Sequence, residues 1–247
     1  MKKWLALAAT AVLGASLLIS GCGSSTNNAS SSGSKEVLKI AANPVPHAEI
    51  LEQVKPILAK EGVDLQIVEF TDYIQPNMAL SSHEVDANFF ANVPYQNNYN
   101  KDHGTNFVSF APVHIEPLAI YSQKIKDLKD LPNGAKVAIP SDPTNSARAL
   151  LLLQSAGLVT LKDPTGLTNT PFDVTSNPKN IQIVELEAAQ IPRSIQDLDA
   201  AVINANYALP AGLNPTKDGL FVEKADSPYA NLLSVNPGDE NKPAIQK

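Results

Sequence analysis

The chain has 247 residues, of which 43% are hydrophobic and 18% charged, and its formal net charge at pH 7 is −6. This balance is typical of a globular protein, and the length is sufficient for one large domain or two lobes. The acidic charge argues against nucleic acid or anionic lipid head groups as partners.

The first 22 residues have the pattern of an export signal. Lys2 and Lys3 precede a mostly apolar run over 4–19, and Ile19-Ser20-Gly21-Cys22 ends it. A basic start and a short apolar core are typical of a secretory signal rather than a membrane span. The small residues before the cysteine resemble a bacterial lipobox, which implies cleavage before Cys22 and acylation of that cysteine. The alternative is an ordinary signal peptide with a chance cysteine.

We therefore predict a signal peptide over 1–21 and a mature protein that lipid holds on the cell membrane, facing outside the cytoplasm. Cys22 is the only cysteine. Its acylation would leave no thiol for a disulfide or for a nucleophile. Residues 23–34 (GSSTNNASSSGS) have no charge and no apolar side chain larger than alanine. We predict that 22–34 form the lipidated cysteine and a flexible tether, and that the fold begins near Lys35.

Strand and helix patterns alternate after the tether. In the first series, strands are predicted over 37–41, 65–70, 85–90 and 107–110, and helices over 48–60, 73–81 and 94–103. Pro56 lies inside the first of these helices and predicts a kink or an early end.

A second, similar series follows. Strands are predicted over 118–121, 136–139, 181–186 and 200–203, and residues 161–178 read largely as loop because they hold three prolines and a glycine. A helix is predicted over 145–156, where four consecutive leucines indicate burial on all sides and Gly157 marks the end. The alternation predicts the α/β class with mostly parallel sheets, and the two series predict two lobes.

Motifs for catalysis or metal binding are absent from the sequence. It contains no HExxH, GxSxG, Walker A or GxGxxG pattern. The histidines are His47, His83, His103 and His114, and none are four residues apart. His47 with Glu49, and His114 with Glu116, would converge on a metal only if the fold joined them. We predict that each histidine is structural or solvated and that the protein has no catalytic residue, metal or cofactor.

The segment over 141–148 (SDPTNSAR) is the first candidate binding site. It follows a strand and opens a helix, which Asp142 or Thr144 can cap with Pro143 near its first position. Free N–H groups at such a start attract anions, and Arg148 could hold a carboxylate through two parallel hydrogen bonds. The alternative is a capped helix with a surface arginine.

Two further groups are candidates. Asn204 and Asn206 follow the apolar strand over 200–203, where open α/β sheets bind ligands, although asparagines also form turns there. Five aromatic residues lie within 26 positions and could line an apolar pocket; they are Phe70, Tyr73, Phe89, Phe90 and Tyr95. The alternative is core packing, which we favour for Phe70 and Phe89.

Seven segments together resemble the NlpA-type family of methionine-binding lipoproteins, the substrate-binding components of bacterial methionine ABC importers. They are PVPHAEIL (44–51), VEFTDYIQPN (68–77), VDANFFANVPY (85–95), IPSDPTNSARALLLLQSAGL (139–158), NPKNIQIVELEAAQIPRS (177–194), AAVINANYAL (200–209) and SPYANLL (227–233). The resemblance implies a periplasmic-binding-protein fold, in which two α/β lobes joined by two crossovers close on a ligand. It places one lobe at 35–117 plus about 224–247 and the other at 118–223.

The resemblance also implies ligand contacts. Arg148 would pair with the carboxylate of an amino acid, and Asn204 and Asn231 would hold its carboxylate and ammonium end. The thioether would lie among the aromatic side chains Tyr73, Phe90 and Tyr95. Asn145 is a weaker candidate.

One position departs from the family pattern. Asn92 stands where many relatives have histidine, and asparagine can donate a hydrogen bond but cannot become charged. This leaves L-methionine, D-methionine and a methionine dipeptide open as ligands. The resemblance also implies that His114 and Glu116 belong to a variable stretch that can touch the ligand. Relatives usually continue with one or more helices beyond the position of Lys247.

These observations predict a non-catalytic receptor that captures methionine and delivers it to an ABC permease with its ATPase. Three alternatives stay open. They are a receptor for another small amino acid or dipeptide, a surface adhesin on the same fold, and a lipid-anchored hydrolase.

Overall fold

The computed structural model describes residues 35–247. The predicted signal peptide, the acylation of Cys22 and the tether lie outside the described residues. Within residues 35–247, the helices are too short or too polar to cross a bilayer.

The first lobe is built on a five-stranded sheet with the order β2-β1-β3-β12-β4. Its strands are β1 (Glu36–Ala42), β2 (Val63–Glu69), β3 (Ala87–Asn92), β4 (Val108–Ile115) and β12 (Ala230–Val235). β1 runs parallel to both β2 and β3, whereas β12 pairs antiparallel with β3 and β4.

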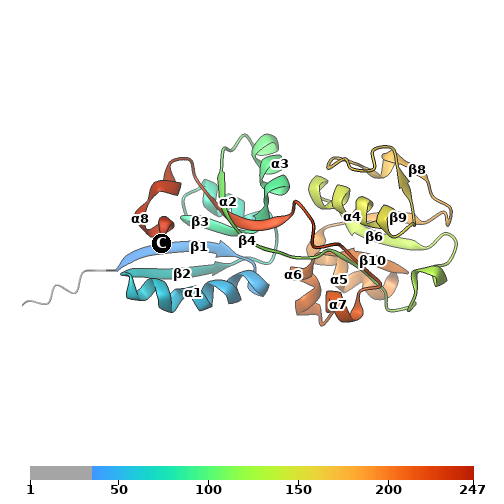
Figure 1. Ribbon diagram of the computed structural model, residues 1–247, viewed down its shortest axis with the longest axis horizontal. Helices are drawn as coiled ribbons and strands as arrows, with labels where there is room; N and C mark the ends of the chain where they lie inside the picture. Colours follow the sequence, from blue (N-terminus) through green and yellow to red (C-terminus); the bar gives the residue numbers. More distant parts are fainter. Residues whose placement is uncertain (1–34) are drawn as a thin grey trace, which may run out of the picture. The chain divides into compact units, whose positions relative to one another are not determined.

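The second lobe has its own sheet with the order β11-β5-β10-β6-β9. Its strands are β5 (Ala119–Tyr121), β6 (Lys136–Pro140), β9 (Gln182–Leu186), β10 (Ala200–Ile203) and β11 (Phe221–Val222). β6 is parallel to β9 and β10, and β5 is antiparallel to β10 and β11. The chain passes from the first sheet to the second between β4 and β5 and returns between β11 and β12 (Figure 1).

The helices cover both faces of the sheets. They are α1 (Glu49–Lys60), α2 (Gln75–Ser81), α3 (Val93–His103), α4 (Pro143–Ser155), α5 (Ile191–Ser194), α6 (Ala205–Ala208), α7 (Pro215–Asp218) and α8 (Pro243–Gln246). A π-type turn over Pro44–Ala48 precedes α1, and short 3₁₀ turns connect many of the other elements. In Figure 1, α1 lies on one side of the first sheet and α2 and α3 on the other.

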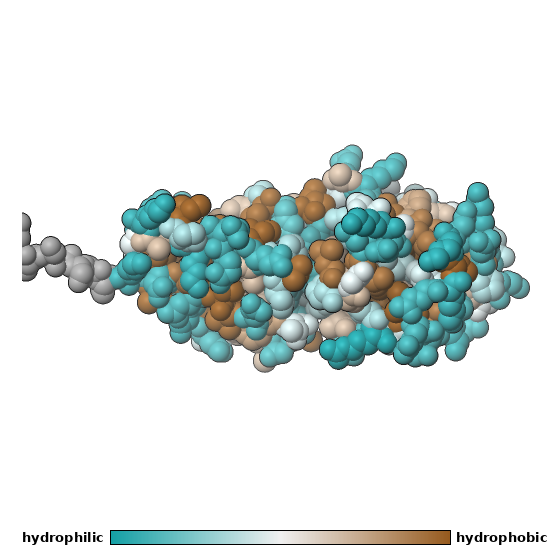
Figure 2. Space-filling view, turned by 90° about the horizontal axis from the view of Figure 1, so that it is seen from below, coloured by the Kyte–Doolittle hydropathy of each residue, from teal (hydrophilic) through white to brown (hydrophobic). Residues whose placement is uncertain are grey.

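Side chains of alternating strand positions fill two cores per sheet, as the two-residue period of a strand requires. On β1, Leu38 and Ile40 pack with Leu51 and Leu58 of α1, while Ala41 joins the core on the opposite face. The second sheet repeats this arrangement with α4 on one face and α5 and α6 on the other. On the face shown in Figure 2, hydrophilic side chains predominate and hydrophobic ones lie between them.

The α/β class is confirmed, but the expectation of mostly parallel sheets is wrong. Each sheet has two parallel and two antiparallel ladders among the described strands. The crossovers explain the mixture, because β5 and β12 each enter a sheet from the other lobe and run against the parallel strands. The strands fall on the predicted sides of the division at 35–117 plus 224–247 and 118–223, while the exact boundaries stay a prediction.

Several predicted elements are corrected. The early end at Pro56 is wrong, because α1 continues to Lys60. Pro56 is exposed, so water can satisfy the carbonyl that loses its partner. Residues 161–178 are largely loop, as predicted, and the exception is a short pair of strands, β7 (Thr160–Leu161) with β8 (Val174–Ser176). The strand predicted over 107–110 extends to Ile115, and its Pro112 is tolerated because β4 is an edge strand.

The helix start predicted at Tyr73 is also wrong, since α2 begins at Gln75. The Asp72 carboxylate accepts the N–H groups of Ile74 and Gln75, which holds the chain in a turn through Tyr73 before the helix begins. β11 and β12 were not predicted by the pattern.

The helix over 145–156 is confirmed, with a start at Pro143. Asp142 caps it by accepting the N–H of Asn145 at 2.9 Å, so Asp142 rather than Thr144 is the cap. Leu150, Leu152 and Leu153 are buried, whereas Leu151 is half-buried, so the expectation of burial on all sides holds for three of the four leucines. These leucines pack α4 against the second sheet, and this packing positions Asn145 and Arg148 on its first turns.

Substitution of Leu150 tests this core. Leu150 is fully buried, so Leu150→Ala should lower the free energy of unfolding by about 2–5 kcal/mol through lost transfer energy and a cavity. Urea denaturation followed by circular dichroism measures the change. Leu167→Ala is the matched control, because Leu167 is 43% exposed and should change stability by less than about 1 kcal/mol. Equal effects of the two substitutions would contradict the packing described.

Candidate functional site

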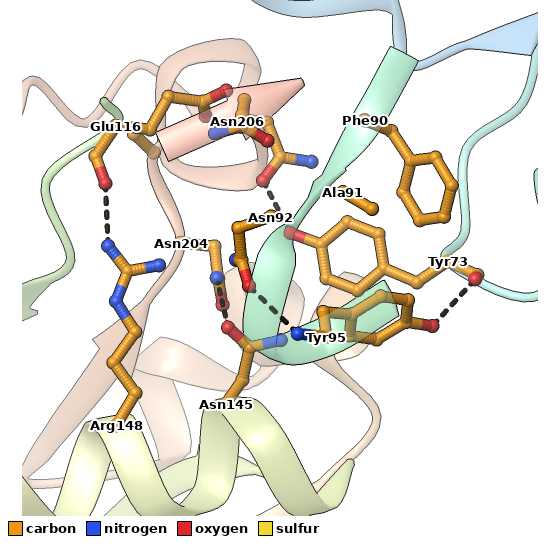
Figure 3. Close-up of a pocket in the computed structure, with 12 residues that line it drawn as sticks. Tyr73, Phe90, Ala91, Asn92, Tyr95, Glu116, Asn145, Arg148, Asn204 and Asn206 are labelled. Atoms are coloured by element: carbon orange, nitrogen blue, oxygen red, sulfur yellow. Dashed lines mark hydrogen bonds between the residues drawn. The ribbon is translucent and has the colours of Figure 1, made fainter. Parts of the chain in front are cut away.

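A pocket gathers side chains from both lobes. It is lined by Tyr73, Phe90, Ala91, Asn92, Tyr95, Glu116, Asn145, Arg148, Asn204, Ala205, Asn206 and Asn231 (Figure 3). All eight residues that the sequence proposes as ligand contacts lie in this lining. They come from the loop before α2, the β3–α3 junction, the start of α4, the end of β10 and β12.

One wall of the pocket is aromatic. The ring centroids of Tyr73, Phe90 and Tyr95 lie 5.7–5.8 Å apart, and the Tyr207 ring lies 4.9 Å from that of Tyr73. Tyr95 donates its hydroxyl to the Tyr73 carbonyl at 2.7 Å, and Tyr73 donates to Asn206 Oδ1 at 2.6 Å. Burial raises the pKa of the Tyr73 and Tyr95 hydroxyls, which keeps them neutral. With the hydroxyls of Tyr73 and Tyr95 bonded, the rings present apolar faces to a ligand.

Arg148 is the positive group of the pocket. It is only 4% exposed, so the alternative of a surface arginine is wrong. Its Nε donates to Glu223 Oε1 at 3.0 Å and its Nη2 to Glu223 Oε2 at 2.5 Å. Nη2 also donates to the backbone carbonyl of Glu116 at 2.7 Å, and the guanidinium lies 4.3 Å from the centre of the Tyr229 ring.

These contacts change how Arg148 can act. Arg148 already makes a pair of parallel hydrogen bonds, from Nε and Nη2 to the Glu223 carboxylate. These two nitrogens are therefore not free for the predicted pair of bonds to a ligand carboxylate. Nη1 has no hydrogen-bond partner among the residues that the structure describes. Arg148 therefore has one nitrogen available for an anion in the pocket, and Glu223 holds the rest of the group in place.

Glu116 is the negative group of the pocket. His114 Nε2 lies 2.9 Å and His47 Nε2 3.0 Å from its Oε1. Burial opposes ionisation and raises the pKa of Glu116, but the contacts with His114 and His47 outweigh it and lower the pKa to about 2. Glu116 is therefore charged at neutral pH, and it lines the same pocket as the Arg148 guanidinium.

The fold joins His47 and His114 to Glu116, which is the convergence that the sequence left open. The prediction that these histidines are structural or solvated stays a prediction. The partner of His47 is Glu116 rather than Glu49. These three residues have donor types that metals accept, and their ligating atoms lie within 4.8 Å of one another.

Asparagines supply most of the uncharged polar groups of the pocket lining. Asn204 donates to Asn145 Oδ1 at 2.9 Å, and Asn145 donates to the Asp142 carboxylate. The Oδ1 of Asn204 is buried without a partner among the described residues. A buried acceptor without a donor is costly, and a ligand N–H can satisfy it.

Asn92 and Asn231 have structural as well as lining positions. Asn92 caps α3, where its Oδ1 accepts the N–H of Tyr95 at 3.0 Å. Asn231 Oδ1 lies 3.3 Å from His47 Nε2. The capping role explains why asparagine suits position 92, since its side chain satisfies a free N–H at the start of α3.

Two lining residues, Ala91 and Ala205, were missed by sequence reasoning, because a buried alanine has no local signal for a site. Asn206 is a sequence candidate together with Asn204 but is absent from the set of eight ligand contacts. Glu116 is predicted only as part of a variable stretch beside the ligand, because its contact with His47 depends on a residue far away in the sequence. Of the predicted aromatic residues, Phe89 is buried in the core of the first lobe, as favoured.

Comparisons with known proteins agree with this architecture. Residues 38–247 match the family model of the NlpA lipoproteins. The chain belongs to the NlpA lipoprotein family. One NlpA relative, the D-methionine-binding lipoprotein MetQ of Salmonella typhimurium, is 43% identical over 99% of this chain and 89% of its own length.

Solved structures show the same fold. A nutrient-binding protein from Burkholderia cenocepacia, solved with methionine bound, is 46% identical and superposes with a TM-score of 0.82 over 85% of this chain and 88% of its own. An ABC transporter periplasmic substrate-binding protein from Coxiella burnetii is 44% identical, with a TM-score of 0.81 over 85% and 88% of the two chains. The periplasmic-binding-protein fold is thereby confirmed.

The ion pair between Arg148 and Glu223 leads to a stability prediction. Glu223→Ala should lower the free energy of unfolding by about 3–5 kcal/mol, because it leaves a buried guanidinium without its countercharge. Urea denaturation at pH 7 measures the change. Glu52→Ala is the control, since its pair with Lys55 is exposed and such pairs contribute about 0–1 kcal/mol. A loss at Glu223 no larger than at Glu52 would show that the guanidinium does not depend on this carboxylate.

Proposed function

We propose that this protein is a substrate-binding lipoprotein, without catalytic activity, that captures methionine outside the cytoplasm and delivers it to an ABC permease. The observation that carries the proposal is the composition of one pocket, in which an aromatic wall adjoins a buried cation, Arg148, and a partly buried anion, Glu116. A zwitterionic amino acid with an apolar side chain has the same three features. The names of the relatives support methionine as that amino acid.

The charged groups suggest how the ligand lies. The carboxylate faces Nη1 of Arg148, which has no other partner among the described residues. The ammonium group lies between Glu116 and the unpaired Oδ1 of Asn204. The ammonium and carboxylate groups of an amino acid are both bonded to its α-carbon. A site for it therefore needs an anion and a cation close together on one side of the pocket.

The remaining lining residues complete this arrangement. The thioether lies against Tyr73, Phe90 and Tyr95, where sulfur makes favourable contacts with aromatic rings. Asn145 holds Asn204 in orientation. Asn92 and Asn231 supply amide groups around the ligand backbone. The proposal leaves L-methionine and D-methionine as equal candidates.

The two lobes have a proposed role in transport. We assign 35–117 plus 224–247 to one lobe and 118–223 to the other, with the ligand between them. The pocket lining comes from both lobes, so a ligand makes its full set of contacts only when the lobes are closed together. Ligand binding therefore favours this closed arrangement. An importer can recognise that arrangement and distinguish loaded from empty protein. A permease and its ATPase are the proposed partners, and acylated Cys22 is the proposed anchor.

A ligand series tests the function. Isothermal titration of ligand-stripped protein should show binding of methionine, somewhat weaker binding of norleucine, and a loss of about 1.5–3 kcal/mol for alanine, which lacks the buried apolar chain. Phe90→Ala should weaken methionine binding by about 1–3 kcal/mol through the same loss of apolar contact.

Phe172→Ala is the matched control for Phe90→Ala. Phe172 is 99% exposed and lies outside the pocket lining, so its removal should leave methionine affinity unchanged. Equal binding of alanine and methionine by the wild type would contradict an apolar pocket for the side chain. Absence of methionine binding would overturn the proposed function.

A substitution of Cys22 tests the anchor. Cys22→Ser removes the thiol that would be acylated, so the variant should lose labelling by radioactive palmitate and should no longer be held in the membrane by lipid. Cell fractionation and palmitate labelling in a bacterial host provide the measurement, with circular dichroism of the purified variant to show that it is folded. Continued labelling of Cys22→Ser would place the lipid elsewhere.

A further inference from the structure

Three titratable side chains from separate segments meet at the edge of the pocket. His47 lies in the turn before α1, His114 lies near the end of β4, and Glu116 follows β4. His47 is 1% exposed, and the side chains of His114 and Glu116 are 21% and 11% exposed. The two imidazole centroids are 5.2 Å apart, and both rings contact the edge or face of Phe89.

Both histidines converge on the same carboxylate oxygen. Their Nε2 atoms lie 2.9 and 3.0 Å from Glu116 Oε1. His114 Nε2 is hydrogen-bonded to this oxygen, whereas His47 Nε2 lies 3.0 Å from it and is hydrogen-bonded to Asn231 Oδ1 at 3.3 Å. An ionised carboxylate and an amide oxygen only accept hydrogen bonds, so each Nε2 carries the proton. Oε2 of Glu116 has no hydrogen-bond partner among residues 35–247, although Glu116 lines the pocket. Oε1 is thus held by the two histidines, and Oε2 is left for a ligand.

The surroundings of His47, His114 and Glu116 favour a clamp, in which the two histidines hold the carboxylate, over a metal site. Nδ1 of His47 and Nδ1 of His114 are both buried without a partner among the described residues. A metal on both Nε2 atoms would move the protons to these Nδ1 atoms and leave two buried donors unpaired. Metal-bound histidines normally donate that second N–H to a carboxylate or carbonyl group.

We infer that His47 and His114 are positioning residues that hold the Glu116 carboxylate so that its free oxygen receives the ammonium group of the ligand. This inference rests on the proposed methionine site. The Glu116 backbone is held as well, since its carbonyl accepts Nη2 of Arg148 and Pro117 restricts it to an extended conformation. The clamp therefore sets the spacing between the negative and positive groups of the pocket.

The experiment compares two ligands on variants of His114, the more exposed of the two histidines. Methionine carries the ammonium group, whereas 4-(methylthio)butanoate has the same carboxylate and thioether without it. His114→Leu removes the donor, and His114→Gln keeps an amide N–H near the position of Nε2. His103→Leu is the control, because His103 stacks on Tyr99 at 4.1 Å and does not line the pocket. The full chain, purified in detergent, is titrated calorimetrically.

A clamp predicts a change in ligand preference. His114→Leu should weaken methionine binding by about tenfold or more, the scale of one charge-assisted hydrogen bond, and should leave the affinity for 4-(methylthio)butanoate within about twofold. His114→Gln should recover most of the loss, and His103→Leu should match the wild type. His47→Gln should likewise retain the preference for methionine, whereas His47→Leu, if folded by circular dichroism, should lose it.

Other outcomes overturn the inference separately from the function. If the wild type binds methionine but His114→Leu weakens both ligands equally, or weakens neither, the histidine does not position Glu116. Methionine binding that is abolished by a chelator and restored by Zn²⁺ would replace the clamp with a metal site. If the wild type binds no methionine, the proposed function fails, and the clamp fails with it.

Discussion

The buried guanidinium of Arg148 is the contact on which the arrangement of the pocket depends. It lies in α4 of the second lobe, yet it bonds Glu223 after β11, the backbone of Glu116 after β4, and the ring of Tyr229 before β12. The last three residues belong to the two crossovers between the sheets. A charge buried to this degree requires compensation, so its partners must stay in place. Arg148 thereby ties both crossovers to the start of α4.

The pocket separates its apolar and charged surfaces. The aromatic wall comes from the first lobe and satisfies its hydroxyls through Tyr95 to the Tyr73 carbonyl and Tyr73 to Asn206. The charged end has Arg148 from the second lobe and Glu116 from the crossover. The hydrogen bond between Tyr73 and Asn206 crosses from one lobe to the other, so the same side chain that forms the wall also connects the two halves. Binding and closure can therefore be coupled through few contacts.

Local features of the site could be read from the sequence. The cap at Asp142, the proline after it and the leucine run define α4, and Arg148 follows within two turns. Asn204 was recognisable because β10 is wholly apolar and short. The concentration of aromatic residues indicated Tyr73, Phe90 and Tyr95, and the resemblance to a family added Asn92, Asn145 and Asn231. All of them line the pocket, although their contacts with a ligand stay a proposal. Glu223 had no local signal, because an isolated glutamate in a loop reads as a solvated charge.

The sequence by itself determined what depends on neighbours within a few residues: the alternation of strands and helices, the cap and the end of α4, and the export signal as a prediction. The tertiary structure decided what depends on distant partners. Glu223 is 75 positions from Arg148, and Asn231 is 184 positions from His47, so no local pattern encodes these pairs. The insertion of β12 between β3 and β4 was decided in the same way. Strand pairing and ion pairing across long separations are set by which buried surfaces and charges satisfy one another in three dimensions, and that is visible only in the folded chain.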